Sequence, residues 1–320
     1  MSKKKFSPQE ANKSKKESTE TEQYAFLVKL AAGSASSVAL ILVVIKFYAW
    51  LVTDSSAMLA STTDSLLDLF ASLMSVVILR FALAPADEEH KFGHGKAESL
   101  AGLVQAAFVL GSAILLIFSG VERVINPQVI VRSEVAIIVT IIALALTIGL
   151  VVLQKVVIKK TGSVVISGDS LHYQSDILLN LGVLLAVFLS QGIWLQADGV
   201  FTILVAIFLL VSAGQIIYTS IYQLMDSELS DEELAKIEEL IGLHSETLGF
   251  HELRTRQAGP KRFIQFHLEL NDDLCLLDAH QICDEVEERI CEEFSPCEVF
   301  IHPDPISVVI HKKKSGAIKG

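Results

Sequence analysis

Residues 61–70 read STTDSLLDLF and lie inside the longer apolar run SAMLASTTDSLLDLFASLMSVVIL (56–79). Such a run is long enough to cross a membrane, which takes about 20 mostly apolar residues. Asp64 and Asp68 nevertheless fall in its interior, where a carboxylate costs about 2.5–3.5 kcal/mol on insertion scales. Their spacing of four residues places both on one face of a helix. The pair therefore indicates a functional site inside a membrane span.

The rest of the composition predicts several such spans. Hydrophobic residues make up 51% of the 320 residues, and the mean hydropathy is +0.50. Five spans follow from length and apolarity, at roughly 25–50, 57–80, 99–121, 135–157 and 199–224. A further one, fifth in chain order, must join the 13-residue run LLNLGVLLAVFLS (178–190) to the polar segment VVISGDSLHYQSDI (164–177). A polar entry of this kind is tolerated only where it faces protein or a wet cavity.

Basic residues in the connections predict the orientation of the six spans. Lysines and arginines are frequent in the N-terminal tail and in the second-to-third and fourth-to-fifth connections, whereas the three opposite connections hold only Arg123 and Arg132. The positive-inside rule then places both termini in the cytoplasm. Lys29 and Lys46, near the ends of the first span, are expected to extend toward the membrane surface. No basic stripe for nucleic acid and no GxxxxGK[ST] nucleotide loop is present.

The fifth span carries a second polar pair, His172 and Asp176, again four residues apart. At 1.5 Å per residue, Asp64 and Asp68 lie about 10 and 16 Å from the outer edge, and the second pair about 12 and 18 Å from the inner edge. Two antiparallel helices would thus present four ligands near mid-membrane. A divalent cation relieves the repulsion among three carboxylates, and this N/O set suits tetrahedral Zn²⁺ better than Mg²⁺ or Ca²⁺. A polar contact between helices or a proton relay is the alternative interpretation.

Beyond Asp226 the pattern changes to a small α+β domain in the order αββαβ. SDEELAKIEELIG (230–242) begins with a serine cap, and FHELRTRQAGPKRFIQFHLEL (250–270) reads as two strands around a turn. DAHQICDEVEERICEEF (278–294) is an amphipathic helix, and CEVFIHPDP (297–305) a last strand. Of the 37 acidic residues in the chain, 21 lie between Asp226 and Asp304, which predicts an acidic surface there. The four cysteines form no CxxC pair, so we expect free, half-buried thiols at Cys275, Cys283, Cys291 and Cys297.

Histidines outside the membrane suggest two more metal sites. Four histidines and one aspartate favour a binuclear metal site on this open-faced α+β domain. The alternative is that they are plain surface residues. The five residues are His251, His267, His280, His302 and Asp304. In the loop PADEEHKFGHGKAES (85–99), the side chains of Asp87, His90 and His94 can surround a zinc ion or form a pH-sensitive hinge.

The chain resembles the cation diffusion facilitators, in particular the bacterial ferrous-iron/zinc efflux pumps of that family. The resemblance runs from about residue 24 to 309 and rests on DSLLD (64–68), FGHGKAESLA (92–101), LHYQSD (171–176), LRTRQAGPKRFIQFHLE (253–269) and IHPDP (301–305). It implies six transmembrane helices followed by a ferredoxin- or metallochaperone-like cytoplasmic domain. It also implies domains at 1–23 (disordered charged tail), 24–225 (membrane), 226–309 (cytoplasmic, dimerising) and 310–320 (disordered tail).

The resemblance also implies roles for individual residues. Asp64, Asp68, His172 and Asp176 would bind the transported ion, with Leu171 as an apolar gate. The five cytoplasmic ligands would hold two metal ions and join two chains, and Lys96 would pair with Asp226 to lock the dimer. Where such relatives often read His-Gln-Asp-Pro, this chain has Pro303 between His302 and Asp304, and Ser170 is smaller than expected.

The implied activity is export of Zn²⁺, with Cd²⁺ and Fe²⁺ as further substrates, in exchange for protons. A homodimer in the bacterial inner membrane would perform it by alternating access, without an organic cofactor. The alternatives are a metal-dependent intramembrane hydrolase, which lacks its HExxH motif here, and a membrane-bound metal sensor, which would not need the intramembrane ligands.

Overall fold

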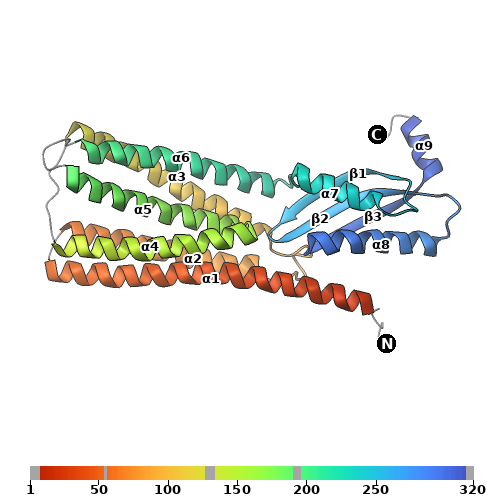
Figure 1. The fold of residues 1–320 in the computed structure, drawn as a ribbon, viewed down its shortest axis with the longest axis horizontal. Helices are drawn as coiled ribbons and strands as arrows, with labels where there is room; N and C mark the ends of the chain where they lie inside the picture. The colour runs from red at the N-terminus through yellow and green to blue at the C-terminus, as the bar shows by residue number, and fades with distance from the viewer. Residues whose placement is uncertain (1–7, 54–55, 127–133, 190–195, 315–320) are drawn as a thin grey trace. The chain divides into compact units, whose positions relative to one another are not determined.

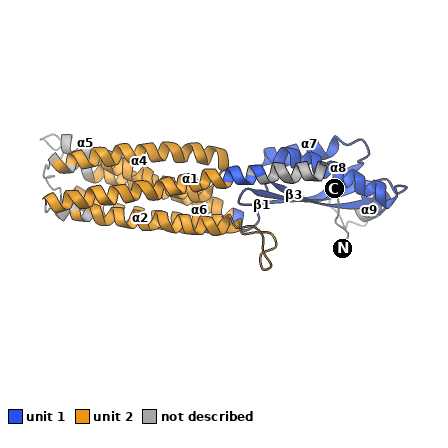
Figure 2. Ribbon diagram, turned by 90° about the horizontal axis from the view of Figure 1, so that it is seen from below, with its two compact units in different colours: residues 1–24, 223–320 blue, residues 25–222 orange. Residues whose placement is uncertain are grey.

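The chain divides into two units, shown in different colours in Figure 2. Residues 25–222 form the first unit, and residues 1–24 with 223–320 form the second. This computed structural model describes residues 8–53, 56–126, 134–189 and 196–314.

Helices account for the regular structure of the first unit, although the first of them begins in the second unit (Figure 1). They are α1 Pro8–Thr53, α2 Ser56–Ala82, α3 Lys96–Ile125, α4 Glu134–Thr161, α5 Val164–Leu189 and α6 Ala197–Leu224. Among the described residues, five of the six are long and apolar enough to cross a membrane; α5 is the other. It is one continuous helix of 26 residues, about 39 Å long, so the polar and apolar segments do join as predicted.

Close packing surrounds α5 on several sides. It lies against α3 and α4 and also touches α2. A glycine permits the approach of α3, since a Cβ at Gly102 would lie 2.5 Å from Val164 Cγ1. Small residues at such crossings bring helix backbones close together in membranes. The polar half of α5 is therefore enclosed by protein, as the cost of its polar groups requires.

The second unit contains a three-stranded sheet in the order β1-β2-β3. Its elements are α7 Asp231–Gly242, β1 Gly249–Ala258, β2 Lys261–Leu270, α8 Leu276–Phe294, β3 Cys297–Pro305 and α9 Ile306–Lys314. β1 pairs with β2 in antiparallel fashion, and β2 with β3 in parallel. The alternation read in β2 is confirmed, because Ile264, Phe266 and Leu268 are fully buried against α7 and α8. Ser230 caps α7 and exchanges hydrogen bonds with Glu233, as its position predicted.

Two expectations about the ends of the chain were wrong in part. We expected residues 1–23 to be disordered, but α1 begins at Pro8 and runs unbroken into the membrane span. The lysine, glutamate, glutamine and alanine residues of this segment are good helix formers. Likewise α9 includes residues 310–314 of the expected C-terminal tail. Residues 1–7 and 315–320 lie outside the described part of the chain.

The prediction of four free thiols was also wrong for two of them. Cys291, near the end of α8, and Cys297, at the start of β3, form a disulfide with a Cα–Cα distance of 5.6 Å. The chain reverses between them, and the reversal brings residues six apart within bridging distance. Cys275 and Cys283 are free. Burial raises the pKa of the Cys283 thiol to about 11, so this cysteine is a protonated thiol at neutral pH.

Candidate metal centres

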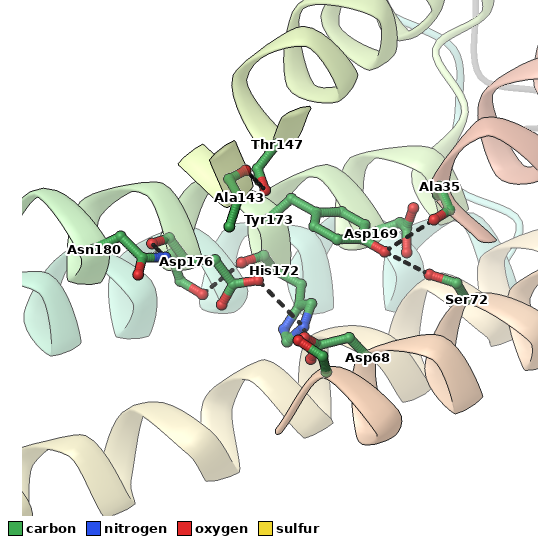
Figure 3. Close-up of polar contacts among 12 residues, drawn as sticks. Ala35, Asp68, Ser72, Ala143, Thr147, Asp169, His172, Tyr173, Asp176 and Asn180 are labelled. Carbon is green, nitrogen blue, oxygen red and sulfur yellow. Dashed lines mark hydrogen bonds and ion pairs between the residues drawn. The ribbon is translucent and has the colours of Figure 1, made fainter. Parts of the chain in front are cut away.

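Three groups of possible metal ligands stand out among the described residues, and each consists of residues from one of the predicted sites. The first lies in the membrane unit, where α2 supplies Asp68 and α5 supplies His172 and Asp176. His172 Nε2 is 2.7 Å from Asp68 Oδ1 and 3.9 Å from Asp176 Oδ2 (Figure 3). One donor atom from each residue falls within 4.8 Å of the others. This spacing, together with the mix of one imidazole and two carboxylates, is suitable for a divalent transition-metal ion.

Asp64, the fourth predicted ligand, lies outside this group. It is one helical turn from Asp68 on α2 and lines a cavity of about 220 Å³ together with Arg123, Leu179 and Phe201. The cavity borders α2, α3, α5 and α6, and Asp64 is exposed at its edge. Its role as a ligand stays a prediction.

Two buried residues that sequence reasoning missed fix the orientation of α5. Tyr173 is 1% exposed; its hydroxyl donates to the Ala35 carbonyl at 3.4 Å and lies 2.8 Å from Ser72 Oγ (Figure 3). Asp169 is also buried, and Gln154 Nε2 donates to its Oδ2 at 2.7 Å. The Tyr173 contacts join α5 to the distant helices α1 and α2, and the Asp169 contact joins it to the preceding helix α4. A sequence signal did exist, because Asp169 precedes His172 by three residues in the same polar segment.

The predicted gate residue is part of the membrane core. Leu171 is buried with Val109, Leu209 and neighbours from α3 and α6. Ser170, the departure from the expected bulky residue, is fully buried, and its carbonyl accepts a hydrogen bond from Gln174 Nε2 at 3.2 Å. A buried apolar residue next to His172 is consistent with a gate. The role of Leu171 as a gate stays a prediction.

The second group lies in the loop between α2 and α3. Asp87 Oδ1 is 3.3 Å from His90 Nδ1, and Asp87 Oδ2 is 3.3 Å from His94 Nε2. The backbone N–H groups of His90 and Glu89 donate to Asp87 Oδ1 and hold the pKa of this carboxyl below its usual value. The Nδ1 atom of buried His94 has no hydrogen-bond partner. The other ring nitrogen of His94, Nε2, is the one beside Asp87. A carboxylate with one imidazole nitrogen 3.3 Å from each of its oxygens fits a metal ligand set.

The third group lies on the sheet of the cytoplasmic unit. Strand pairing aligns His251 with His267 and His267 with His302, so one row of imidazoles crosses three strands. Asp304 sits at the end of this row: its Oδ2 lies 3.0 Å from His267 Nδ1 and 3.4 Å from His251 Nε2. Its Oδ1 lies 3.3 Å from His302 Nε2. A carboxylate with separate imidazoles at its two oxygens has the arrangement of a bridge between two ions.

A buried carboxylate behind this row also escaped sequence reasoning. Glu269 is 4% exposed, and its Oε1 is 3.1 Å from His251 Nδ1. This leaves Nε2 of His251 pointing to Asp304 without a hydrogen-bond partner. Carboxylates that hold a ligand histidine by its other nitrogen are a frequent feature of metal sites. Gly249 makes the space, because a Cβ there would lie 2.9 Å from Glu269 Oε2.

His280, a further predicted ligand, lies apart from the group around Asp304. It is on α8, where its Nδ1 lies 3.6 Å from Asp284 Oδ1. Asp226 follows α6, adopts a φ of 57° and accepts from Arg256 Nη1 at 3.3 Å. The pairing of Lys96 with Asp226 stays a prediction for the assembled dimer.

Comparison with known proteins follows the division into two units. The family described as the cation efflux transmembrane domain matches residues 34–225, and the cation efflux protein cytoplasmic domain matches residues 229–306. A protein named cation-efflux pump FieF from Shewanella oneidensis is 46% identical over 290 residues, which is 91% of this chain and 98% of that protein. Proteins of the same name from Pectobacterium atrosepticum and Klebsiella pneumoniae are 46% and 44% identical, over 89% and 90% of this chain and 95% and 96% of theirs.

Proposed function

Because this chain belongs to the cation efflux family, we propose that it exports Zn²⁺ from the cytoplasm in exchange for protons. Membership makes the protein a multi-pass membrane transporter of cations rather than an enzyme. The observation that carries the finer proposal is the half-buried group of Asp68, His172 and Asp176, which α2 and α5 bring together. Two carboxylates and an imidazole offer a transition-metal ion the ligands that replace its water. Cd²⁺ and Fe²⁺ are further substrates, since such N/O sites rank metals without excluding them.

Exchange with protons follows from the same donor atoms. Metal binds only to deprotonated ligands, so one site is occupied by either the ion or protons. In the inward-facing state the ligands take the ion from the cytoplasm. In the outward-facing state protons replace it, and the protonated site returns. Alternating access of this type needs no nucleotide.

We further propose that the protein is a homodimer in the bacterial inner membrane, with both termini in the cytoplasm. The charge distribution of the connections supports the orientation. Dimerisation through the cytoplasmic unit is supported by two leucines, Leu276 and Leu277, which are 84% and 72% exposed beside a groove that includes His280. Leucines this exposed on a folded domain are typical of an interface. The row of His251, His267, His302 and Asp304 would then hold zinc as a regulatory site.

Transport in proteoliposomes tests the proposal. Purified protein is reconstituted with a zinc-sensitive and a pH-sensitive dye in the lumen, and zinc is added outside. Wild type is compared with Asp68→Asn, which keeps the size of the side chain, and with Glu122→Gln, a matched change at an exposed position of α3. We expect opposing zinc and proton fluxes in wild type and Glu122→Gln, and neither flux in Asp68→Asn.

A membrane-bound sensor is the second candidate, favoured by the row of ligands on the cytoplasmic sheet. Zinc that binds the protein without crossing the membrane in any variant would overturn the exporter and support the sensor. Zinc flux in wild type without a proton flux would retain export and refute the coupling.

A further inference from the structure

Lys46, near the end of the first membrane span, is a charged residue whose side chain contacts the neighbouring helix. Its ammonium turns to α2, where it donates to Ser65 Oγ at 2.7 Å and to the Ser61 carbonyl at 3.4 Å. Ser65 is 1% exposed, so the contact is made inside the helical unit. A lysine held at this depth is costly and calls for partners of opposite charge.

Those partners are the carboxylates of the candidate transport site. Ser65 lies in sequence between Asp64 and Asp68, so the serine that anchors the ammonium belongs to the same turn of α2. The hydrogen bond to Ser65 holds the ammonium beside the turn of α2 that carries both aspartates, and Asp68 in that turn contacts His172 of α5. One lysine on α1 is therefore placed next to the carboxylates that α2 contributes to the site.

We propose that Lys46 is the resident counter-cation of the transport site and sets how tightly the site holds its metal. With the site empty, the ammonium offsets part of the charge of the clustered carboxylates. When a divalent metal ion is bound, the ammonium of Lys46 repels that ion. The repulsion weakens metal binding enough for the ion to be released. This inference rests on the proposed export function and assigns a specificity and affinity role to a residue that is not a ligand.

Substitutions separate this role from that of a simple tie between α1 and α2. Lys46→Met keeps the length and the apolar stem of the side chain but removes the charge, whereas Lys46→Arg keeps the charge. Ser65→Ala removes the hydroxyl anchor only. Lys29→Met is the matched control, because Lys29 lies exposed near the other end of the same span.

Zinc uptake into proteoliposomes, measured as KM and maximal rate, supplies the test. For Lys46→Met we expect KM for zinc to fall at least about tenfold. That is the effect of removing one unit charge several ångströms from a divalent ion with the dielectric of water between them, and the lower dielectric of protein makes the effect larger. The maximal rate should fall too, because the ion leaves more slowly. Lys46→Arg and Lys29→Met should behave as wild type.

An unchanged or higher KM in Lys46→Met would overturn the proposal. If the Tm of that variant were also lower than that of wild type, Lys46 would serve only to hold α1 against α2. Equilibrium competition between the full-length protein and a zinc dye gives a second readout independent of transport. A roughly tenfold tighter Kd in Lys46→Met supports the inference even if wild type moves no zinc. If wild type moves no zinc but Lys46→Met still binds zinc more tightly, export is refuted and the role of Lys46 in metal affinity is retained.

Discussion

Replacing His267 by alanine should abolish most of the stabilisation that zinc gives the cytoplasmic sheet. His267 is the central imidazole of the row, 3.0 Å from Asp304 Oδ2 and stacked on His251 with ring centroids 4.9 Å apart. A four-ligand zinc site contributes about 10–16 kcal/mol of binding free energy, or about 3 kcal/mol per ligand. Because 1.4 kcal/mol is a factor of ten, the variant should bind zinc at least about 100-fold more weakly.

Hydrogen exchange of the full-length protein, read in peptides from 249–270 and 297–305, measures the consequence locally. With free zinc at 100 times Kd, wild type gains about 2.7 kcal/mol, and exchange by unfolding of the sheet slows about 100-fold. In His267→Ala the same zinc concentration is near Kd, so the gain is about 0.4 kcal/mol and the slowing about twofold.

His311→Ala is the matched control, since His311 lies exposed on α9 and belongs to none of the three ligand groups found among the described residues. It should keep the full response to zinc. Equal slowing in His267→Ala and wild type would refute the assignment of this row as a metal site, as would the absence of any zinc effect in wild type.

Three other changes test the framework around the sites. Gly102→Ala should destabilise the membrane unit by about 1–3 kcal/mol because its Cβ would meet Val164, whereas Gly111→Ala, with nothing within 4 Å, should be harmless in thermal unfolding in detergent. Tyr173→Phe should cost about 1–3 kcal/mol, since Ser72 and Ala35 lose a buried partner; a Tm equal to wild type would contradict it. Burial alone raises the pKa of Glu233, but hydrogen bonds from Ser230 and Arg262 outweigh it and hold that pKa below 4.5. Its contribution is therefore present above pH 4.5 and lost as the pH falls through the folded-state value, so the Tm difference between wild type and Glu233→Gln should shrink below pH 4.5.

Much of the site was predictable because its signals are local. Ligands four residues apart share a helix face whatever surrounds them, which is why Asp68, His172 and Asp176 could be placed at one depth. His251 and His267 belong to strands joined by a short turn, which places them near each other. The register set by the turn would pair His251 with Leu268, and the irregularity between His251 and Arg254 shifts the pairing to His267.

What escaped prediction depends on tertiary contacts. The importance of Asp169 depends on its hydrogen bond from Gln154 on α4. That of Glu269 depends on its contact with a ring nitrogen of His251 on the neighbouring strand. The bond between Cys291 and Cys297 depends on how the chain reverses after α8. Lys46 could reach either the surface or α2 by its length alone, and only the position of Ser65 decides between them.

The row of histidines across β1, β2 and β3 has a consequence for how the sheet is assembled. His251, His267 and His302 face one another only in the native strand register, and a slip of one residue sends a side chain to the opposite face. In the proposed site, zinc would therefore bind a correctly paired sheet and gain little from a misaligned one. The ion would select the native alignment during folding, so metal supply in the cell would set how much newly made protein matures.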